Sequence, residues 1–230
     1  MNINGRDAMA LKQKEFEVLY ELDRSASRPS QRQLAEKTGL SLGTVNKTLS
    51  ELSEKQLTED GSISSRGLAA LEPYRVDNAV IMAAGLSSRF APISYEKPKG
   101  LLKVRGEVLI ERQIRQLREA GIDDITVVVG YKKEYFFYLK EKFGVRIVVN
   151  PEYATRNNNG TLWRVRNILG NTYICSSDDY FTENVFRDHV YKAEYSAIYA
   201  AGETDEWCIE TAASGRIAGV TVGGHDSWIM

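Results

Sequence analysis

Hydrophobic residues in the first third of the chain recur at the spacing of an α-helix. The first expected helix covers residues 11–24. Its buried face carries Phe16, Leu19 and Leu22. A second helix is expected to begin at Ser30, because Ser30 and Gln33 have the spacing of a capping box, and to end before Gly39. The hydrophobic pattern therefore predicts a helical N-terminal part.

The next residues predict a helix-turn-helix followed by a short hairpin. A third helix is expected to begin at Ser41, directly after the turn at Gly39. Its buried face carries Val45, Leu49 and Leu52. Residues 56–64 are typical of a hairpin, and residues 65–71 are expected to form a closing helix. This order resembles the winged-helix modules of bacterial regulators of the MarR type.

After residue 77, short β-branched runs alternate with amphipathic stretches. The expected strands cover residues 78–83, 125–129, 146–150 and 172–176, and the expected helices cover residues 109–119, 132–143 and 160–168. This alternation predicts an α/β fold with a doubly wound, mainly parallel sheet, in which ligands bind at the carboxyl ends of the strands. Pro73 lies in the expected linker, so we predict a winged-helix domain over residues 1–76 and a second domain over residues 77–230.

Composition and charge narrow the class of protein without indicating a partner. The chain has 230 residues, of which 43% are hydrophobic and 27% are charged, with a formal net charge of −1. These values are typical of a soluble globular protein and give no general reason to expect an anionic membrane or nucleic acid as partner. No apolar run approaches the roughly 20 residues that span a bilayer, and two cysteines are too few for a disulfide framework. We therefore expect a cytoplasmic protein with no membrane partner.

The most informative stretch of the chain is residues 79–102, where an apolar strand runs into a turn of small residues. Ala83, Ala84 and Gly85 leave room for a polyanion to approach the backbone N–H groups, which carry partial positive charge. The cations that follow this turn are Arg89, Lys97 and Lys99. The chain contains neither the P-loop motif nor the glycine motif of dinucleotide-binding folds. The stretch therefore predicts a different kind of triphosphate site.

This stretch resembles the signature of the nucleotidyltransferases that join a nucleoside triphosphate to a phosphorylated small molecule. The matching residues are Ala83, Ala84, Gly85, Arg89, Pro98 and Lys99. The sequence departs from the family pattern at Ser87, where many members carry a second glycine. The alternative interpretation is an ordinary turn of small residues after a buried strand, which is common in α/β proteins.

Acidic residues follow the last expected strand of the sheet, where a bound triphosphate should lie. Asp178 and Asp179 come directly after residues 172–176, and magnesium takes one or two protein carboxylates together with phosphate oxygens and water. In the resembled family an acidic residue after this strand binds the metal, which implies Mg²⁺ at Asp178. Asp179 or Thr182 could instead cap a following helix.

The resemblance implies a reaction in which an acceptor phosphate attacks the α-phosphorus and pyrophosphate leaves. A phosphate nucleophile is already ionised near neutral pH, so catalysis rests on positioning and on neutralising negative charge. We expect Arg89 to contact the leaving β- and γ-phosphates. Lys99 is expected to contact the α-phosphate and the acceptor, and Asp178 to hold the metal.

Within the family, the best match is to phosphocholine cytidylyltransferases, over residues 78 to about 220. This likeness places Asn157, Asn158, Gly160 and Thr161 near the nucleotide, although an asparagine run could equally form a turn before a helix.

Choline cannot donate a hydrogen bond from its quaternary ammonium, so its recognition calls for aromatic faces and a carboxylate. The candidates are Tyr180, Glu206 and Trp207. Ordinary packing of Trp207 in a strand is the alternative. Family members usually continue beyond the point that matches Met230, so we also expect the second domain to lack its C-terminal segment.

The third expected helix could enter the major groove of DNA. Its candidate contacts are Thr44, Asn46, Lys47 and Ser50. Residues 1–77 hold 11 Lys and Arg against 12 Asp and Glu. Because phosphate contacts dominate affinity for DNA, such a module should bind weakly unless a homodimer forms. A winged helix used for protein contacts or dimerisation remains the alternative.

The leading interpretation is a magnesium-dependent nucleotidyltransferase that makes CDP-choline from CTP and phosphocholine. A sugar-phosphate or molybdopterin-type nucleotidyltransferase is an alternative, since Ala-Ala-Gly followed by Ser-Ser-Arg also resembles the latter, but the spacing to Pro98 and Lys99 argues against it. A DNA-binding regulator whose second domain senses a nucleotide without catalysis is an alternative from another class.

Overall fold

The computed structural model describes residues 10–87, 91–156 and 158–230. It contains two compact units, residues 1–191 and 192–230. The predicted domain boundary after residue 76 lies inside the first unit and stays a prediction.

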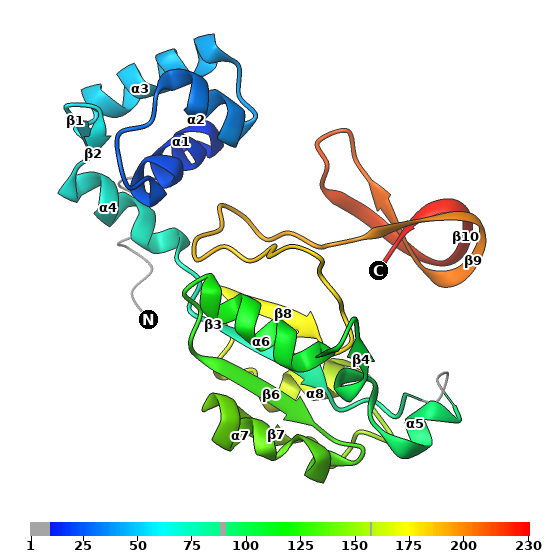
Figure 1. Cartoon of the computed structure of the whole chain (residues 1–230). Helices are drawn as coiled ribbons and strands as arrows, with labels where there is room; N and C mark the ends of the chain where they lie inside the picture. Colours follow the sequence, from blue (N-terminus) through cyan, green and yellow to red (C-terminus); the bar gives the residue numbers. More distant parts are fainter. Residues whose placement is uncertain (1–9, 88–90, 157) are drawn as a thin grey trace. The chain divides into compact units, whose positions relative to one another are not determined.

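The N-terminal part of the first unit is a winged helix (Figure 1). Its elements are α1 (Gln13–Arg24), α2 (Gln31–Thr38), α3 (Leu42–Glu54), β1 (Thr58–Glu59), β2 (Ser62–Ile63) and α4 (Ser65–Leu71). The capping box is confirmed, because the Gln33 backbone N–H donates to Ser30 Oγ at 3.3 Å and the Ser30 backbone N–H donates to Gln33 Oε1 at 2.8 Å. Gly39 has a φ of 68°, a left-handed conformation that glycine adopts without strain and that turns the chain from α2 into α3.

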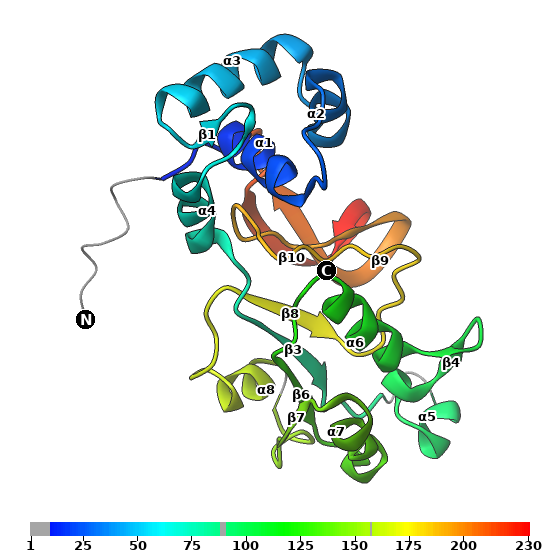
Figure 2. The same ribbon diagram turned by 60° about the vertical axis from the view of Figure 1, so that its left-hand side comes forward.

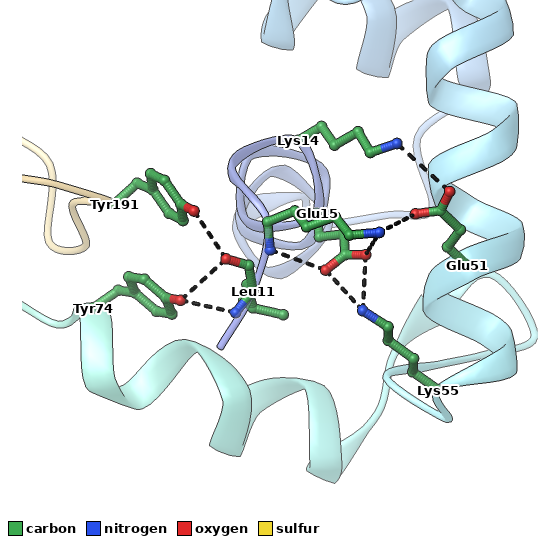
Figure 3. A network of polar contacts seen from close by, with 8 residues as sticks. Leu11, Lys14, Glu15, Glu51, Lys55, Tyr74 and Tyr191 are labelled. Atoms are coloured by element: carbon green, nitrogen blue, oxygen red, sulfur yellow. Dashed lines mark hydrogen bonds and ion pairs between the residues drawn. The ribbon is translucent and has the colours of Figure 1, made fainter. Parts of the chain in front are cut away.

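A fully buried carboxylate joins α1 to the end of α3 (Figure 3). Lys55 Nζ donates to the two Glu15 oxygens at 2.8 and 2.9 Å, and the Lys12 backbone N–H donates to Oε2 at 3.0 Å. Burial by itself raises the pKa of Glu15, but the hydrogen bonds and charges of Lys55 and Lys12 outweigh burial and hold the pKa below its usual value. The ionised form of Glu15 is therefore part of the folded winged helix.

Substitution of Lys55 by methionine is expected to lower the free energy of unfolding by about 1–3 kcal/mol at neutral pH, because the buried Glu15 carboxylate loses its main partner. A carboxylate with a lowered folded-state pKa stabilises the fold above its unfolded pKa, and that contribution is lost as the pH falls through the folded pKa. The difference between wild type and Lys55→Met should thus shrink on acidification.

Urea unfolding measured at neutral pH and below the ordinary glutamate pKa of about 4.3 tests this expectation. Lys47→Met, at an exposed position of α3, is the matched control and should leave stability nearly unchanged at both pH values. A difference between Lys55→Met and wild type that stays constant with pH would contradict the role given to ionised Glu15.

The rest of the first unit is built on a four-stranded sheet of order β7-β6-β3-β8, in which all neighbouring strands are parallel (Figure 2). The strands are β3 (Asn78–Ala83), β6 (Ile125–Val129), β7 (Arg146–Val149) and β8 (Thr172–Ser176). The helices are α5 (Ile93–Glu96), α6 (Leu109–Glu119), α7 (Tyr138–Phe143) and α8 (Asn158–Arg164). Short elements are η1 (Glu72–Tyr74), η3 (Lys99–Leu101), η4 (Lys133–Phe136), β4 (Lys103–Val104) and β5 (Glu107–Val108).

Alternation along β3 divides the core between the two faces of the sheet. The side chains of Ala79, Ile81 and Ala83 pack with apolar residues of α6 and α7. Val80 lies on the other face, in a smaller cluster with Val128 and Val165. The predicted doubly wound α/β fold is thereby confirmed.

Two predicted helices differ from the observed ones. The helix expected over residues 132–143 is divided into η4 and α7, and Phe136 and Leu139 are both fully buried. The helix expected over residues 160–168 begins earlier and ends at Arg164. Beyond it, i→i+3 bonds from Val165 to Leu162 and from Ile168 to Val165 tighten the chain into turns.

Residues 186–191 return to the winged helix and complete its aromatic core. The Tyr20 hydroxyl donates to Asp188 Oδ1 at 2.7 Å, and the Arg187 guanidinium lies 4.2 Å from the centroid of the Tyr20 ring. The Tyr191 ring lies 5.6 Å from that of Phe16, and its hydroxyl donates to the Leu11 carbonyl at 3.0 Å. Figure 3 shows this tyrosine beside Tyr74 at the start of α1. The segment that follows β8 therefore packs in two hydrophobic cores, that of the sheet and that of the winged helix.

The second unit is a long antiparallel hairpin of β9 (Ile198–Thr211) and β10 (Ile217–Ile229). Several register shifts interrupt the pairing, which explains why the hairpin curls strongly in Figure 1. Of its apolar side chains, Cys208 and Ile209 are buried. In the part of the chain that the structure describes, no helix has both the length and the apolar character needed to cross a membrane.

Candidate functional site

The candidate site lies where the sheet changes its direction of winding. The chain winds from β3 to β6 and β7 on one side, and β8 is added on the other side of β3. The carboxyl ends of β3 and β8 therefore meet at a topological switch point, where open α/β sheets bind ligands. A cavity of about 300 Å³ opens there and is lined by residues from the β3 turn, η3, the start of α8 and the end of β8.

The turn after β3 brings small residues to the cavity. Gly85 and Ser87 line the cavity, whereas Ala84 is buried and accepts a hydrogen bond from the Tyr131 backbone N–H at 3.3 Å. Ser87 has a φ of 56°, in the left-handed region that favours glycine. Ser87, the position where the sequence departs from the family pattern, therefore has a conformation that glycine adopts without strain.

Opposite charges meet at the floor of the cavity. Lys99 Nζ lies 3.5 Å from Asp178 Oδ2, and their side chains are 22% and 40% exposed. Gly100 makes this approach possible, because a Cβ at this position would lie 2.8 Å from Ser177 Cβ and Oγ. Sequence reasoning missed Gly100, although its place directly after Pro98 and Lys99 was a usable signal.

A second carboxylate adjoins Asp178. Burial, followed by the negative charge of Asp178, raises the pKa of Asp179. Among residues 10–87, 91–156 and 158–230, no cluster of three or more His, Cys, Asp or Glu side chains is placed to hold a metal. One or two carboxylates in a cavity fit a cation that obtains its remaining oxygens from phosphates and water. The donor set at Asp178 is thus compatible with a divalent metal of that kind.

The structure brings together part of the predicted nucleotide site. The predicted residues that line the cavity are Ala83, Gly85, Lys99, Asn158 and Asp178. Arg89 and Asn157 lie outside the residues that the structure describes.

Other residues predicted to lie near the nucleotide have different surroundings. Thr161 is buried, and its hydroxyl accepts a hydrogen bond from Asn150 Nδ2 at 3.1 Å, so it ties α8 to the end of β7. Gly160 is half-buried against the side chain of Arg156.

The predicted acceptor residues are divided between the two units. Tyr180 belongs to the first unit, outside the cavity lining, and the Arg112 guanidinium lies 5.0 Å from its ring centroid. Glu206 and Trp207 belong to β9 of the second unit, where Trp207 is 53% exposed. The Glu206 backbone N–H donates to Thr204 Oγ1 at 3.2 Å.

The predicted DNA-contacting residues all lie on α3. Asn46, Lys47 and Ser50 are exposed. Thr44 is half-buried, and its hydroxyl lies 2.8 Å from Ser41 Oγ, so it takes part in the helix N-terminus. Three of the four side chains are thus exposed to a partner surface, although the Ser50 hydroxyl donates to the Asn46 carbonyl oxygen at 3.3 Å.

Gly130 is a further residue that sequence reasoning missed. It follows β6, and a Cβ there would lie 2.6 Å from both the Ala84 carbonyl oxygen and Tyr153 Cβ. Only glycine allows β6 to end this close to the β3 turn. The signal was a glycine directly after the apolar run Ile125–Val129.

Comparison with known proteins identifies two matching families and several related proteins. The family model of MobA-like NTP transferase domains matches residues 79–207, and a model of winged helix-turn-helix DNA-binding domains matches residues 11–57. A choline-phosphate cytidylyltransferase of Streptococcus pneumoniae is 45% identical over 129 residues, covering 56% of each chain. A 2-aminoethylphosphonate cytidylyltransferase of Lancefieldella rimae is 38% identical over 157 residues, covering 66% of this chain and 64% of the relative.

A solved structure agrees with these relationships. The CTP:phosphocholine cytidylyltransferase of Streptococcus pneumoniae aligns with a TM-score of 0.64 and 40% sequence identity, over 67% of this chain and 68% of that one. The chain spans 56% and 64% of the length of the two curated relatives named above. Since the first family model covers more than half of the residues, this chain belongs to the family of proteins with a MobA-like NTP transferase domain.

Proposed function

We propose that this protein is a nucleotidyltransferase that transfers CMP from CTP to phosphocholine. The observation that carries the proposal is the pairing of Lys99 with Asp178 in a cavity at the switch point of the sheet. The relatives support CTP as the nucleotide, because both curated relatives named above are cytidylyltransferases.

The proposed reaction is an in-line displacement at the α-phosphorus of CTP. A bond forms between an acceptor phosphate oxygen and the α-phosphorus, while the bond to the bridging oxygen of the leaving pyrophosphate breaks. The acceptor phosphate is already ionised at neutral pH, so no general base has to remove a proton. The protein then has to align the reactants and neutralise the charge that develops on the phosphate oxygens.

We assign this neutralisation to two residues that line the cavity. Lys99 would contact the α-phosphate and the acceptor phosphate, and its ammonium lies 3.5 Å from the Asp178 carboxylate. Asp178 would hold Mg²⁺, with Asp179 beside it. When bound, Mg²⁺ would supply positive charge that offsets the negative charge of the triphosphate. Arg89 stays a predicted contact of the β- and γ-phosphates.

The acceptor is proposed from the relatives and from aromatic side chains. Phosphocholine and 2-aminoethylphosphonate, the acceptors in the relatives' names, both join an anionic phosphorus group to a cationic nitrogen. Tyr180 would offer a ring face to such a nitrogen. Glu206 and Trp207, on β9 of the second unit, stay predicted acceptor residues. We also propose a cytoplasmic location, which suits the two free, buried thiols of Cys175 and Cys208.

A substrate panel tests the proposal. Pyrophosphate release is measured with CTP, UTP, ATP and GTP, each combined with phosphocholine, 2-aminoethylphosphonate or a sugar 1-phosphate, with and without Mg²⁺. We expect the highest rate with CTP, phosphocholine and Mg²⁺. Faster turnover of a sugar phosphate would favour the sugar-nucleotide alternative. CTP binding by calorimetry without turnover of any acceptor would favour a nucleotide sensor.

DNA is proposed as a second partner on the strength of the winged-helix match and of α3, which exposes Asn46, Lys47 and Ser50. Fluorescence anisotropy with random duplexes, measured over a range of salt concentrations, tests for a phosphate-dependent interaction. Light scattering on the same samples shows whether binding accompanies a homodimer. Absence of binding at low salt would favour a winged helix that contacts protein.

A further inference from the structure

The segment that follows β8, which includes Asp178, lacks regular secondary structure. Residues 177–187 form neither helix nor strand. Side chains of α6 satisfy several of the backbone carbonyl groups along it: Gln113 Nε2 donates to the Ser176 carbonyl at 3.1 Å, and Gln116 Nε2 donates to the Phe181 and Glu183 carbonyls at 3.3 and 3.1 Å. The path of this segment therefore depends on one face of a helix.

Arg112 makes the most extensive contact between α6 and this segment. Its Nε donates to the Phe181 carbonyl and its Nη2 to the Thr182 carbonyl, both at 2.9 Å. Its Nη1 donates to Glu107 Oε2 at 2.6 Å, and its guanidinium lies 5.0 Å from the centroid of the Tyr180 ring. The side chain is 20% exposed. Each nitrogen of the guanidinium thus has a partner, and one face of the Tyr180 ring is covered.

We propose that Arg112 is a positioning residue for the acceptor: it fixes residues 180–182 and leaves Tyr180 a single ring face for the cationic nitrogen of the acceptor. This inference rests on the proposed function. Glu107 balances the charge of Arg112, which reduces the repulsion that an uncompensated guanidinium would exert on a cation at the other ring face.

The planar fork of arginine is essential to this arrangement. Two neighbouring carbonyl oxygens are held by two N–H groups in one plane, and the same guanidinium lies over the Tyr180 ring, 5.0 Å from its centroid. A lysine ammonium has the charge but cannot make these contacts in a fixed geometry. A lysine at position 112, which keeps only the charge, should therefore not restore the positioning of this segment.

The neighbouring Arg115 provides a matched control. It extends from the same helix and binds the same carboxylate, with its Nη2 donating to Glu107 Oε1 at 2.8 Å. Its second ion pair is with Glu111 at 3.6 Å. Among the described residues, the hydrogen bonds and ion pairs of Arg115 do not involve residues 177–184. A comparison of Arg112→Gln with Arg115→Gln therefore separates positioning of the segment from the loss of a positive charge on α6.

Steady-state kinetics of the full chain with CTP and phosphocholine tests the inference. Loss of hydrogen bonds from a charged donor predicts that Arg112→Gln lowers kcat/KM for phosphocholine by roughly tenfold to a hundredfold, while the KM for CTP stays close to that of wild type. Arg112→Lys should behave like Arg112→Gln. Arg115→Gln should retain wild-type kinetics. Circular dichroism confirms that each variant is folded at the assay temperature.

Hydrogen exchange supplies a readout that needs no activity. Amides of residues 177–184 should exchange faster in Arg112→Gln than in wild type, and Arg115→Gln should not show this increase. If wild type releases no pyrophosphate but exchange changes as expected, the proposed function fails while the structural role of Arg112 stands. Equal kinetics of Arg112→Gln and Arg115→Gln in an active protein, or full recovery by Arg112→Lys, would overturn the inference.

Discussion

Replacement of Asp178 by alanine is expected to lower the rate of pyrophosphate release from CTP and phosphocholine by at least about a hundredfold. The carboxylate lies at the end of β8 within 3.5 Å of Lys99, on the side of the cavity where we place the triphosphate and its cation. Without it, Mg²⁺ would lose its protein anchor, and the charge that develops during transfer would be neutralised less well.

Measurements of CTP affinity distinguish the proposed metal-binding role of Asp178 from a role limited to the ion pair with Lys99. If Asp178 served only to pair with Lys99, its removal would strengthen CTP binding, because the cavity would lose a negative charge that repels the phosphates. We expect instead that Asp178→Ala loses the gain in CTP affinity that Mg²⁺ gives wild type, as measured by calorimetry with Mg²⁺ and with a chelator. Asp123→Ala, at an exposed position before β6, is the control and should keep full activity. An Asp178→Ala rate close to that of wild type would refute the assignment.

Replacement of Phe16 by alanine is expected to lower the free energy of unfolding by about 3–5 kcal/mol, the range for large aromatic residues in a core. Its side chain is fully buried. Its ring lies 5.7 Å from that of Tyr20, 5.0 Å from that of Tyr74 and 5.6 Å from that of Tyr191. The surrounding rings come from three separate segments, so the cavity left by the substitution should not close easily.

Urea unfolding of the full chain measures the loss of stability. The control is Phe137→Ala, because that phenylalanine is 45% exposed and its truncation should cost far less. Hydrogen exchange should also rise in residues 186–191, which pack on the same ring through Tyr191. A loss smaller than that of Phe137→Ala would show that the aromatic cluster does not stabilise the fold.

The sequence predicted most of the elements that position the candidate site. Strands β3, β6 and β8 and helix α6 have the predicted bounds, because an unbroken apolar run or a strong helical stripe identifies each of them. The long hairpin of β9 and β10 was largely missed. Most of its side chains are exposed or half-buried, and no long apolar run in the sequence reveals its length.

The candidate site was predicted where motif and topology agree. Lys99 and Asp178 follow family-like segments at the ends of adjacent strands, and the structure brings them together. Arg112 could not have been found in this way, because its helical position looks like an ordinary exposed charge. Its contacts with Tyr180 and with the carbonyl groups beyond it depend on how α6 lies against the segment after β8.

The return of residues 186–191 to α1 has a practical consequence for any attempt to isolate the N-terminal module. A fragment cut after residue 76 would contain every helix of the winged helix and yet leave the Tyr20 hydroxyl without Asp188 and the Phe16 ring without Tyr191. Aromatic surface that is buried in the full chain would then be exposed to water, and such a fragment should aggregate in solution. A fusion protein that uses this module should therefore also include residues 186–191, which lie more than a hundred residues further along the chain.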